Sequence, residues 1–272
     1  MNHRKVILST NIAETSVTVQ GVRFVVDSGL VKQKSHKQAG ALLNALEVKS
    51  VSKAQATQRA GRAGREAPGK CFRIFTAETF EKMAEVTVPE ILRCNLAAVI
   101  LSLKALGIND VSQVDFIDKP DMLSLLCAFQ TLIKLDAVNQ QTAALTPLGH
   151  EMSVMPTDPV FSRLLVQSLQ PQFIEVCRDI AAIVAMLSVE NVFYTVSNLD
   201  SKSPADKLKL KQIKKRKRLM APSSDHLSLL NVYREFVGIR DGRQQAQWCQ
   251  EYLLNFKSIQ KAVQICHQLV DY

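Results

Sequence analysis

The sequence predicts an α/β region at its N-terminal end, followed by a chain that is mostly α-helical. Residues 1–89 contain short apolar and β-branched runs separated by turn residues, which is typical of strands. From residue 90 onward, apolar residues recur every three or four positions, which is the period of an amphipathic helix. Several of these patterns begin at a proline, which is favoured in the first turn of a helix. The 272 residues suffice for two or three small domains.

Within residues 1–89 the expected order is strand, turn, strand, hairpin, helix and strand. The three single strands are expected over residues 5–9, 22–26 and 71–75. Alternating residues over 30–36 and 46–52 predict a β-hairpin. Ser52 is a favourable N-cap residue for a helix that runs to Arg65.

Residues 58–65 read Gln-Arg-Ala-Gly-Arg-Ala-Gly-Arg, with arginines three positions apart. On a helix or a tight helical turn this spacing places Arg59, Arg62 and Arg65 on nearly one face. The small residues between them let a ligand approach the backbone closely. Because guanidinium groups bind phosphate through two parallel hydrogen bonds, this face is suited to phosphate. A solvated basic loop is the plainer interpretation of the same run.

A second stretch, residues 9–19, reads Ser-Thr-Asn-Ile-Ala-Glu-Thr-Ser-Val-Thr-Val and follows the apolar run at residues 6–8. We expect a buried strand that ends in a turn rich in hydroxyl and amide groups. Such groups bond well to a sugar–phosphate backbone and carry no base information. Together the two stretches resemble motifs V and VI of the DEAH-box helicases, ATP-driven RNA-remodelling enzymes of helicase superfamily 2. The resemblance covers essentially the whole chain and is strongest at 5–19 and 54–76.

The resemblance implies roles at the nucleotide. Arg62 and Arg65 match the arginine fingers, which stabilise the charge that develops on the transferring phosphoryl group. Gln58 matches a residue that helps to order the phosphates and the attacking water, so these three residues are the expected catalytic set. Thr18 matches a nucleotide contact. Gln20 stands where some relatives carry an aspartate that binds the ribose, and it offers an uncharged hydrogen bond instead.

The resemblance also implies contacts with single-stranded RNA. Thr10 and Asn11 match residues that hold RNA phosphates. The hairpin of the family projects towards RNA, and its first arm is basic here. The basic residues of this arm are Lys32, Lys34, His36 and Lys37. An ordinary solvated hairpin is the plainer interpretation of that arm. In the arginine motif, Arg59 is expected to have a structural role rather than to contact a ligand.

Three domains are implied by the same resemblance. Residues 1–89 correspond to part of the second RecA-like domain, residues 90–157 to a winged-helix domain, and residues 158–272 to the helical-bundle or ratchet domain. The expected fold is thus a partial α/β RecA-like domain followed by mostly α-helical domains. We expect the winged helix to act mainly as a structural hub rather than as a direct reader of nucleic acid.

Helix signals support this division from residue 90 onward. Pro89 is expected to open a helix that ends at Gly107, and Pro120 a second one. The second helix is predicted to bury Leu123 and Leu126 among the residues of its apolar face. A short hairpin is expected over residues 135–145.

Further helices are expected beyond that hairpin. Thr146 and Asp158 are predicted to cap helices that begin with proline, and Asp225 to cap a later one. A helix is expected from Phe173 to Leu187, and two more near 244–254 and 256–270. Trp248 is expected to pack between helices rather than to stack on a base.

Residues 207–218 contain eight Lys or Arg in twelve positions. Three interpretations of this basic tract remain open: a solvated linker with some RNA affinity, a nuclear-import signal, or a phosphate-binding patch.

The chain contains no convincing nucleotide-binding P-loop. Residues 64–70 resemble the glycine-rich part of one, but Cys71 replaces the Ser or Thr that would hold Mg²⁺, and a helix precedes where a strand is needed. In the family, ATP and Mg²⁺ are bound mainly by the first RecA-like domain. We therefore expect residues 1–272 by themselves not to hydrolyse ATP. The alternative is a truncated, non-catalytic module that binds RNA or a partner.

Composition limits the remaining possibilities. The net charge of +9 favours a polyanionic partner. The six cysteines show neither metal-ligand spacing nor a disulfide framework, so no metal site is expected and a reducing intracellular compartment is indicated. No apolar run is long enough to span a membrane, and no signal peptide is recognisable. A nuclear, nucleolar or cytoplasmic location is expected, with RNA, ATP and protein activators as partners.

Overall fold

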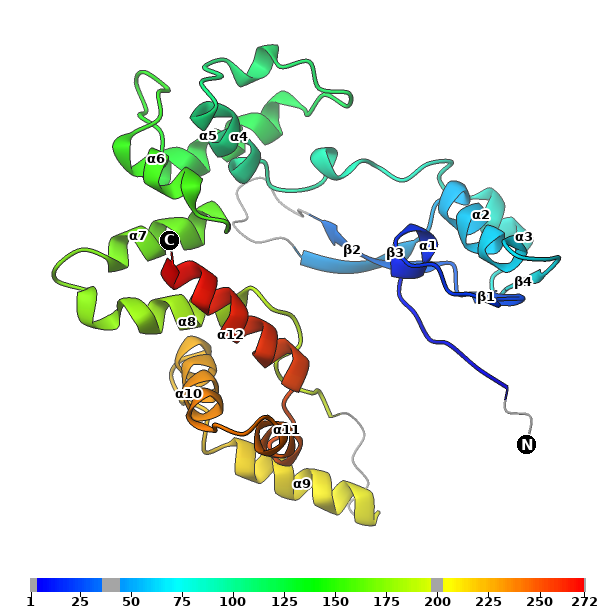
Figure 1. The fold of residues 1–272 in the computed structure, drawn as a ribbon. Coiled ribbons are helices and arrows are strands. Elements are labelled where there is room, and N and C mark those ends of the chain that lie inside the picture. Colours follow the sequence, from blue (N-terminus) through cyan, green and yellow to red (C-terminus); the bar gives the residue numbers. More distant parts are fainter. Residues whose placement is uncertain (1–3, 36–44, 197–202, 272) are drawn as a thin grey trace. The chain divides into compact units, whose positions relative to one another are not determined.

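The computed structural model describes residues 4–35, 45–196 and 203–271 (Figure 1). Contacts divide the chain into two compact units. The first unit comprises residues 1–100 and 110–131, and the second comprises residues 101–109 and 132–272. Both units contain parts of 90–157, and the three-domain division stays a prediction.

The first unit contains a pair of parallel strands. Strand β1 (Phe24–Asp27) pairs with β4 (Lys70–Arg73), and the Lys70 amide donates to the Arg23 carbonyl at 2.9 Å. Between them the chain forms the antiparallel hairpin of β2 (Leu30–Ser35) and β3 (Ala45–Ser50). The strands predicted near 22–26 and 71–75 are therefore confirmed, and so is the hairpin over its described residues. His36 and Lys37 of its predicted basic arm lie outside the described residues.

The buried strand predicted over residues 5–9 is wrong. Residues 4–10 have no regular secondary structure, and Val6 and Leu8 are 79% and 95% exposed. An apolar run forms a strand only where a neighbouring strand completes its hydrogen bonds. Within the described residues the parallel sheet contains β1 and β4 alone. The run leads instead into the short helix α1 (Ile12–Thr15).

The helix that carries the arginine motif, α2 (Lys53–Gly61), begins as predicted at Ser52. The Ser52 hydroxyl accepts from the Gln55 amide at 3.2 Å, and the Gln55 side chain accepts from the Ser52 amide at 3.1 Å. This reciprocal capping box satisfies two free amides of the first turn. The α-helix ends at Gly61, earlier than predicted, and continues as the 3₁₀ turn η1 (Arg62–Gly64). Helix α3 (Ala77–Glu81) follows β4.

The single helix predicted from Pro89 to Gly107 is wrong, because the chain divides there. A 3₁₀ turn, η2 (Glu90–Leu92), precedes α4 (Ala97–Ala105). The Asn95 side chain accepts from the Ala97 amide at 2.8 Å and so starts a new helix. Gly107 ends α4 as expected, with a φ of 85°. A further 3₁₀ turn, η3, covers Val111–Gln113.

Helix α5 (Met122–Lys134) is present, but the apolar face assigned to it is wrong in part. Leu123 and Leu126 are 62% and 52% exposed, whereas Leu125 and Leu132 are buried. Asp121, rather than Pro120, starts the helix, since its carboxylate accepts from the amide and hydroxyl of Ser124.

The predicted reversal over 135–145 is present as an antiparallel bridge between Val138 and Leu145. Thr146 then caps α6 (Pro147–Val154), accepting from the Gly149 amide at 2.9 Å. The winged-helix arrangement of these elements stays a prediction.

Helices build the second unit. After α6 they are α7 (Pro159–Ser168), α8 (Cys177–Leu187), α9 (Pro204–Arg216), α10 (Asp225–Gly238), α11 (Gly242–Glu251) and α12 (Phe256–Asp271). Helix α8 packs along α12 and α10 (Figure 1). Their fully buried side chains include Val184, Val232 and Ile259, so the core lies between these helices.

Three helix starts predicted for the second unit can be compared with the structure. Asp158 caps α7 as expected, accepting from the Val160 amide at 3.0 Å. The cap of α10 is Ser224 rather than Asp225, because the Ser224 hydroxyl accepts from the Leu227 amide. Part of the segment expected to form a helix from residue 173 is a 3₁₀ turn, η4 (Ile174–Val176), which leads into α8.

Trp248 packs in the second unit as predicted. Its ring centre lies 6.4 Å from that of Phe236 and 5.0 Å from that of Tyr252. The basic tract at 207–218, by contrast, is not a linker, since α9 covers most of it. In the described part of the chain, no helix is both long and apolar enough to cross a membrane.

Candidate nucleotide and RNA interface

The two predicted motifs lie together in the first unit. The segment from Thr10 to Gly21 contains α1, which contacts α2. Side chains of the arginine motif and of the residue after it bind this segment at successive points. The bonds join Arg59 to Glu14, Arg65 to Thr18, and Glu66 to the Gly21 amide. The fold therefore brings motif V and motif VI into direct contact.

Arg59 links the two motifs through buried ion pairs. Its guanidinium Nε lies 2.7 Å from Glu14 Oε1, and its Nη1 lies 2.8 Å from Asp27 Oδ1. The Arg59, Glu14 and Asp27 side chains are 14%, 9% and 0% exposed. Burial acts to lower the pKa of Arg59, but the hydrogen bonds to Asp27 and Glu14 outweigh burial and raise the pKa. This geometry confirms the structural role expected of Arg59.

Arg62 and Arg65 differ from Arg59, because neither forms an ion pair with a described residue. Arg65 is exposed, and its Nη1 donates to the Thr18 hydroxyl at 2.6 Å. Arg62 is partly buried, and its Nη1 is shielded from solvent without a hydrogen-bond acceptor among the described residues. Buried donors are normally bonded, so this nitrogen lacks the acceptor that a ligand oxygen would provide. Gln58 is exposed on α2.

The residues predicted to bind RNA lie where the segment begins. Thr10 and Asn11 are both exposed. The Thr10 hydroxyl accepts from the Ile12 amide at 3.5 Å. Asn11 occupies the N-cap position of α1, yet its side chain makes no capping bond. The side-chain amide of Asn11 is therefore not used to cap α1.

The predicted nucleotide contacts lie further along the same segment. Thr18 accepts from Arg65, as described above, and Gln20 is exposed next to a tight turn. The turn residue Gly21 has a φ of 73°, and its amide donates to Glu66 Oε2 at 3.0 Å. Thr18 and Gln20 are thus held next to the end of the arginine motif, whereas no bond of this kind joins Thr10 or Asn11 to it in the described structure.

Sequence reasoning missed the carboxylates that organise the site. Glu14 is buried, and it accepts from both Gln55 and Arg59. A signal was available, because Glu14 is the only acidic residue before Asp27. A lone carboxylate between apolar and hydroxyl residues, in a chain that also carries an arginine motif, indicates a buried ion pair.

The P-loop-like sequence at 64–70 does not have the structure of a P-loop. A side chain at Gly69 would collide with the backbone oxygens of Ala63 and Arg23, so glycine is needed where η1 packs on the start of β4. Lys70 begins a strand rather than a helix. No helix N-terminus is formed there to receive phosphate, and the rejection of a P-loop is confirmed.

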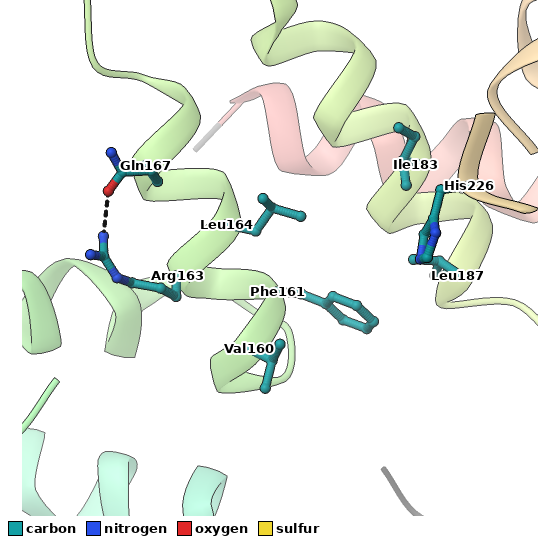
Figure 2. A pocket seen from close by; sticks show the side chains of 8 residues that line it. All are labelled: Val160, Phe161, Arg163, Leu164, Gln167, Ile183, Leu187 and His226. Atoms are coloured by element: carbon teal, nitrogen blue, oxygen red, sulfur yellow. Dashed lines mark hydrogen bonds between the residues drawn. The ribbon is translucent and has the colours of Figure 1, made fainter. Parts of the chain in front are cut away.

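A hollow of about 560 Å³ is found in the second unit (Figure 2). Its lining is mostly apolar, from α7 and α8, and His226 of α10 also lines it. Arg163 at its edge donates to the Gln167 side chain at 2.7 Å. None of the predicted nucleotide or RNA residues lines this hollow. Across the described residues no group of three His, Cys, Asp or Glu side chains is placed to hold a metal ion.

Comparison with known proteins adds two family matches. Residues 1–67 match the model of the helicase conserved C-terminal domain. Residues 158–229 match the ratchet-like helicase-associated domain, HA2. The two matches cover the arginine motif in the first unit and helices α7 to α9 in the second.

Individual relatives are similar over nearly the whole chain. The pre-mRNA-splicing factor ATP-dependent RNA helicase DEAH10 of Arabidopsis thaliana is 39% identical over 99% of this chain and 37% of its own length. The ATP-dependent RNA helicase DHX33 of Mus musculus is 39% identical over 98% of this chain and 36% of its own. The chain thus spans a little over a third of the length of the curated relatives that it matches. With both domain models matched in this order, the chain belongs to the DEAH-box helicases and corresponds to a C-terminal portion of them.

Proposed function

We propose that this chain acts as the C-terminal portion of an ATP-dependent RNA helicase, for RNA unwinding or the remodelling of RNA–protein particles. One observation carries the proposal: Arg62 and Arg65 have no anionic partner among the described residues, while Arg59 beside them is fully paired. A partly buried guanidinium that served only structure, at the position of Arg62, would normally be paired as Arg59 is. The relatives, whose names describe ATP-dependent RNA helicases, support the same function.

In the proposed mechanism, Arg62 and Arg65 contact the terminal phosphates of ATP and stabilise the charge that develops during phosphoryl transfer. Gln58 helps to order the phosphates and the attacking water, and Thr18 and Gln20 contact the nucleotide. The guanidinium groups fit phosphate, whereas the described residues offer no ligand set for Mg²⁺. ATP with Mg²⁺ would supply the transferable phosphoryl group, held mainly by the first RecA-like domain of the family.

RNA binding in this proposal uses the backbone of a single strand. Thr10 and Asn11 are exposed, and their hydroxyl and amide groups suit phosphate and sugar oxygens without reading bases. Glu14, only three residues after Asn11, is bonded to Arg59. The RNA contacts and the arginine fingers are therefore attached to the same buried ion pair, which provides a physical link between RNA binding and ATP turnover.

The proposed domains are a partial RecA-like domain at 1–89, a winged helix at 90–157 and a ratchet domain at 158–272. Protein activators are proposed as further partners, and the nucleus, nucleolus or cytoplasm as the location. ATP turnover by the longer protein is proposed from the family, and residues 1–272 by themselves are expected to show none.

The fingers are tested in a protein that joins this chain to a P-loop domain of the family. Arg62→Ala and Arg65→Ala should each lower RNA-stimulated ATP turnover by about 10³-fold or more. Arg23→Ala removes an exposed arginine just before β1 and should leave turnover unchanged. Equal losses in all three variants, or none in the two finger variants, would contradict the assignment.

The RNA contacts are tested on residues 1–272 without nucleotide. Thr10→Ala and Asn11→Ala should weaken the binding of a short oligouridylate, with Thr57→Ala as an exposed threonine control on α2. Binding should also weaken steeply as salt rises, because phosphate contacts release counterions. An affinity that is the same at low and physiological salt would show that phosphate is not what these residues hold.

The rival function is a non-catalytic module that binds RNA or a partner. It predicts normal RNA binding by residues 1–272, together with unchanged turnover in the finger variants of the joined protein. ATP turnover therefore separates the two functions, and RNA binding alone does not.

A further inference from the structure

The positive charge of this chain is concentrated in one helix of the second unit and in the turn that follows it. Residues 207–218 contain eight Lys or Arg and no Asp or Glu, and the whole chain has a net charge of +9. This tract therefore accounts for nearly all of the net charge, and the rest of the chain is close to neutral. Charge that served solubility alone would work as well if it were dispersed over the surface.

One side of α9, which contains most of this tract, is fastened to the second unit. The Arg216 guanidinium lies 5.5 Å from the centre of the Phe193 ring and donates to the Tyr194 carbonyl at 3.1 Å. Lys215 Nζ lies 2.7 Å from Glu251 Oε2. These bonds fix how α9 is rotated about its own axis, and so they fix which of its cations face solvent.

The exposed cations that point away from Arg216 form a stripe. It consists of Lys207, Lys211 and Lys214 of α9 and of Arg218 in the turn just after the helix. The spacing of four and three residues places the three lysines on one face of α9, with about 5–6 Å between neighbouring Cβ atoms. All four are exposed, and none forms an ion pair with any residue that the structure describes. The stripe is therefore a regular row of uncompensated charges on a fixed support.

Helix stability does not account for the stripe. Like charges four residues apart on a helix repel each other, and Lys207 and Lys211 have this spacing. A cation near the start of a helix also opposes the helix dipole, and Lys207 is the fourth residue of α9. Only the cations of the last turn are favoured by that dipole. The stripe therefore destabilises α9 when no ligand is bound, and a bound anion would relieve the repulsion between its cations.

We infer that the stripe is a docking surface for the sugar–phosphate backbone of single-stranded RNA, separate from the contacts proposed at Thr10 and Asn11. The choice of RNA as the polyanion rests on the proposed function. A row of evenly spaced charges matches a polymer that carries one charge per repeat. Lysine acts as a point charge on phosphate, and α9 contains no aromatic side chain for base stacking, so the binding is independent of sequence.

The same geometry disfavours a nuclear-import signal. A basic peptide that is recognised in an extended form would require α9 to unfold and to give up the bonds of Arg216 and Lys215 to the second unit. An RNA strand needs no such change, because the stripe already faces solvent.

The test compares two matched pairs of lysines in the full 272-residue chain. Lys207→Gln/Lys211→Gln removes two stripe charges four residues apart. Lys257→Gln/Lys261→Gln removes two exposed charges with the same spacing on α12. Glutamine is a good helix former, so both variants should keep the wild-type circular dichroism. The probe is a short fluorescent oligouridylate, whose binding is measured by anisotropy over a range of salt concentrations.

The stripe variant should bind the oligouridylate several-fold more weakly. The slope of log K against log salt should fall in magnitude by about 1.4, because each lost phosphate contact on a single strand removes about 0.7. The α12 variant should keep the wild-type slope. Equal changes in both variants would show that RNA binding depends only on the net charge of the chain and not on the position of the stripe, and would overturn the inference.

Two further outcomes are decisive. Unchanged oligouridylate binding, together with loss of nuclear accumulation of the stripe variant, would identify an import signal and overturn the RNA surface. Weakened binding in the stripe variant but not in Thr10→Ala or Asn11→Ala would support the stripe and remove the motif V contacts from the proposed function. The reverse pattern would overturn the stripe alone.

Discussion

Arg59 and Asp27 form a buried ion pair, in which guanidinium Nη1 lies 2.8 Å from carboxylate Oδ1. Asp27 ends strand β1, and Arg59 lies on α2 one turn before Arg62. The pair therefore fixes the helix of the arginine motif against the sheet. Glu14 bonds the same guanidinium at 2.6 Å and adds the α1 segment. One side chain thus holds three pieces of the first unit together.

Arg59→Ala should destabilise the first unit by about 3–5 kcal/mol, because it leaves two buried carboxylates without their cation. Hydrogen exchange of β1 and α2 amides measures this loss directly. Trp248 fluorescence does not, because that residue lies in the second unit. Arg65→Ala, which removes an exposed guanidinium, should change protection by less than about 0.5 kcal/mol. A similar loss in both variants would contradict the role given to Arg59.

Gly69→Ala should destabilise the first unit by about 1–3 kcal/mol, since the new methyl group meets the backbone oxygens of Ala63 and Arg23, which can move only with η1 and the start of β1. Gly61→Ala provides the matched control. A Cβ at Gly61 would have no atom within 4 Å, and alanine favours the helix. Gly61→Ala should therefore maintain or raise stability in the same exchange experiment. If it lowers ATP turnover in the joined protein, the need for glycine there is functional. Destabilisation by Gly61→Ala would refute this reading.

The second unit should lose stability in alkali. Burial raises the pKa of the Cys249 thiol from 9.0 to about 11. Between these values the unfolded chain has lost the proton that the folded chain keeps, so the stabilisation is complete below pH 9 and is lost as pH rises to about 11. The free energy of unfolding should fall with a slope of up to about 1.4 kcal/mol per pH unit for this group.

Urea unfolding followed by Trp248 fluorescence at a series of pH values measures this slope. Tyr233 should steepen it, because burial and a hydrogen bond to Cys266 raise its pKa in the same direction. Cys249→Ala should flatten the slope over this range. A free energy of unfolding that rises between pH 9 and 11 would contradict the prediction, because buried groups that stay neutral require it to fall.

Arg216→Ala should loosen α9 while the remainder of the second unit stays folded. It removes the packing of Arg216 on Phe193 and its hydrogen bond to the Tyr194 carbonyl, which together should contribute about 1–2 kcal/mol. Hydrogen exchange of α9 amides should rise accordingly. Lys217→Ala removes the exposed neighbouring cation and should leave exchange unchanged. Equal exchange in the two variants would show that Arg216 is not the anchor of α9.

Features that depend on a few neighbouring residues were predictable from the sequence. Ser52, Thr146 and Asp158 were recognised as helix caps. The side chain of each accepts a hydrogen bond from a backbone amide in the first turn of its helix. The parallel strands and the hairpin followed from short apolar runs between turn residues. The arginine motif and the hydroxyl-rich segment identified the family, because side-chain type and spacing suffice for that comparison.

Features that depend on distant partners were not predictable in this way. The apolar run at 6–8 was expected to be a buried strand and is exposed, because strand formation needs a neighbouring strand. Asn95 divides a helix whose apolar period looked continuous. A linker was one interpretation of the basic tract from its charge, but most of the tract is helix α9, and Lys215 and Arg216 bond it to distant residues of the second unit.

The sequence by itself determined that this chain carries the arginine motif of its family and a helical C-terminal region. Only the tertiary structure decided which arginine is structural, because the three are chemically alike and differ in what surrounds them. Arg59 meets Glu14 and Asp27, which are 45 and 32 residues away in sequence, whereas Arg62 meets no carboxylate in the described structure. Local spacing fixes which face a side chain occupies, but only folding brings distant charges close enough to neutralise it.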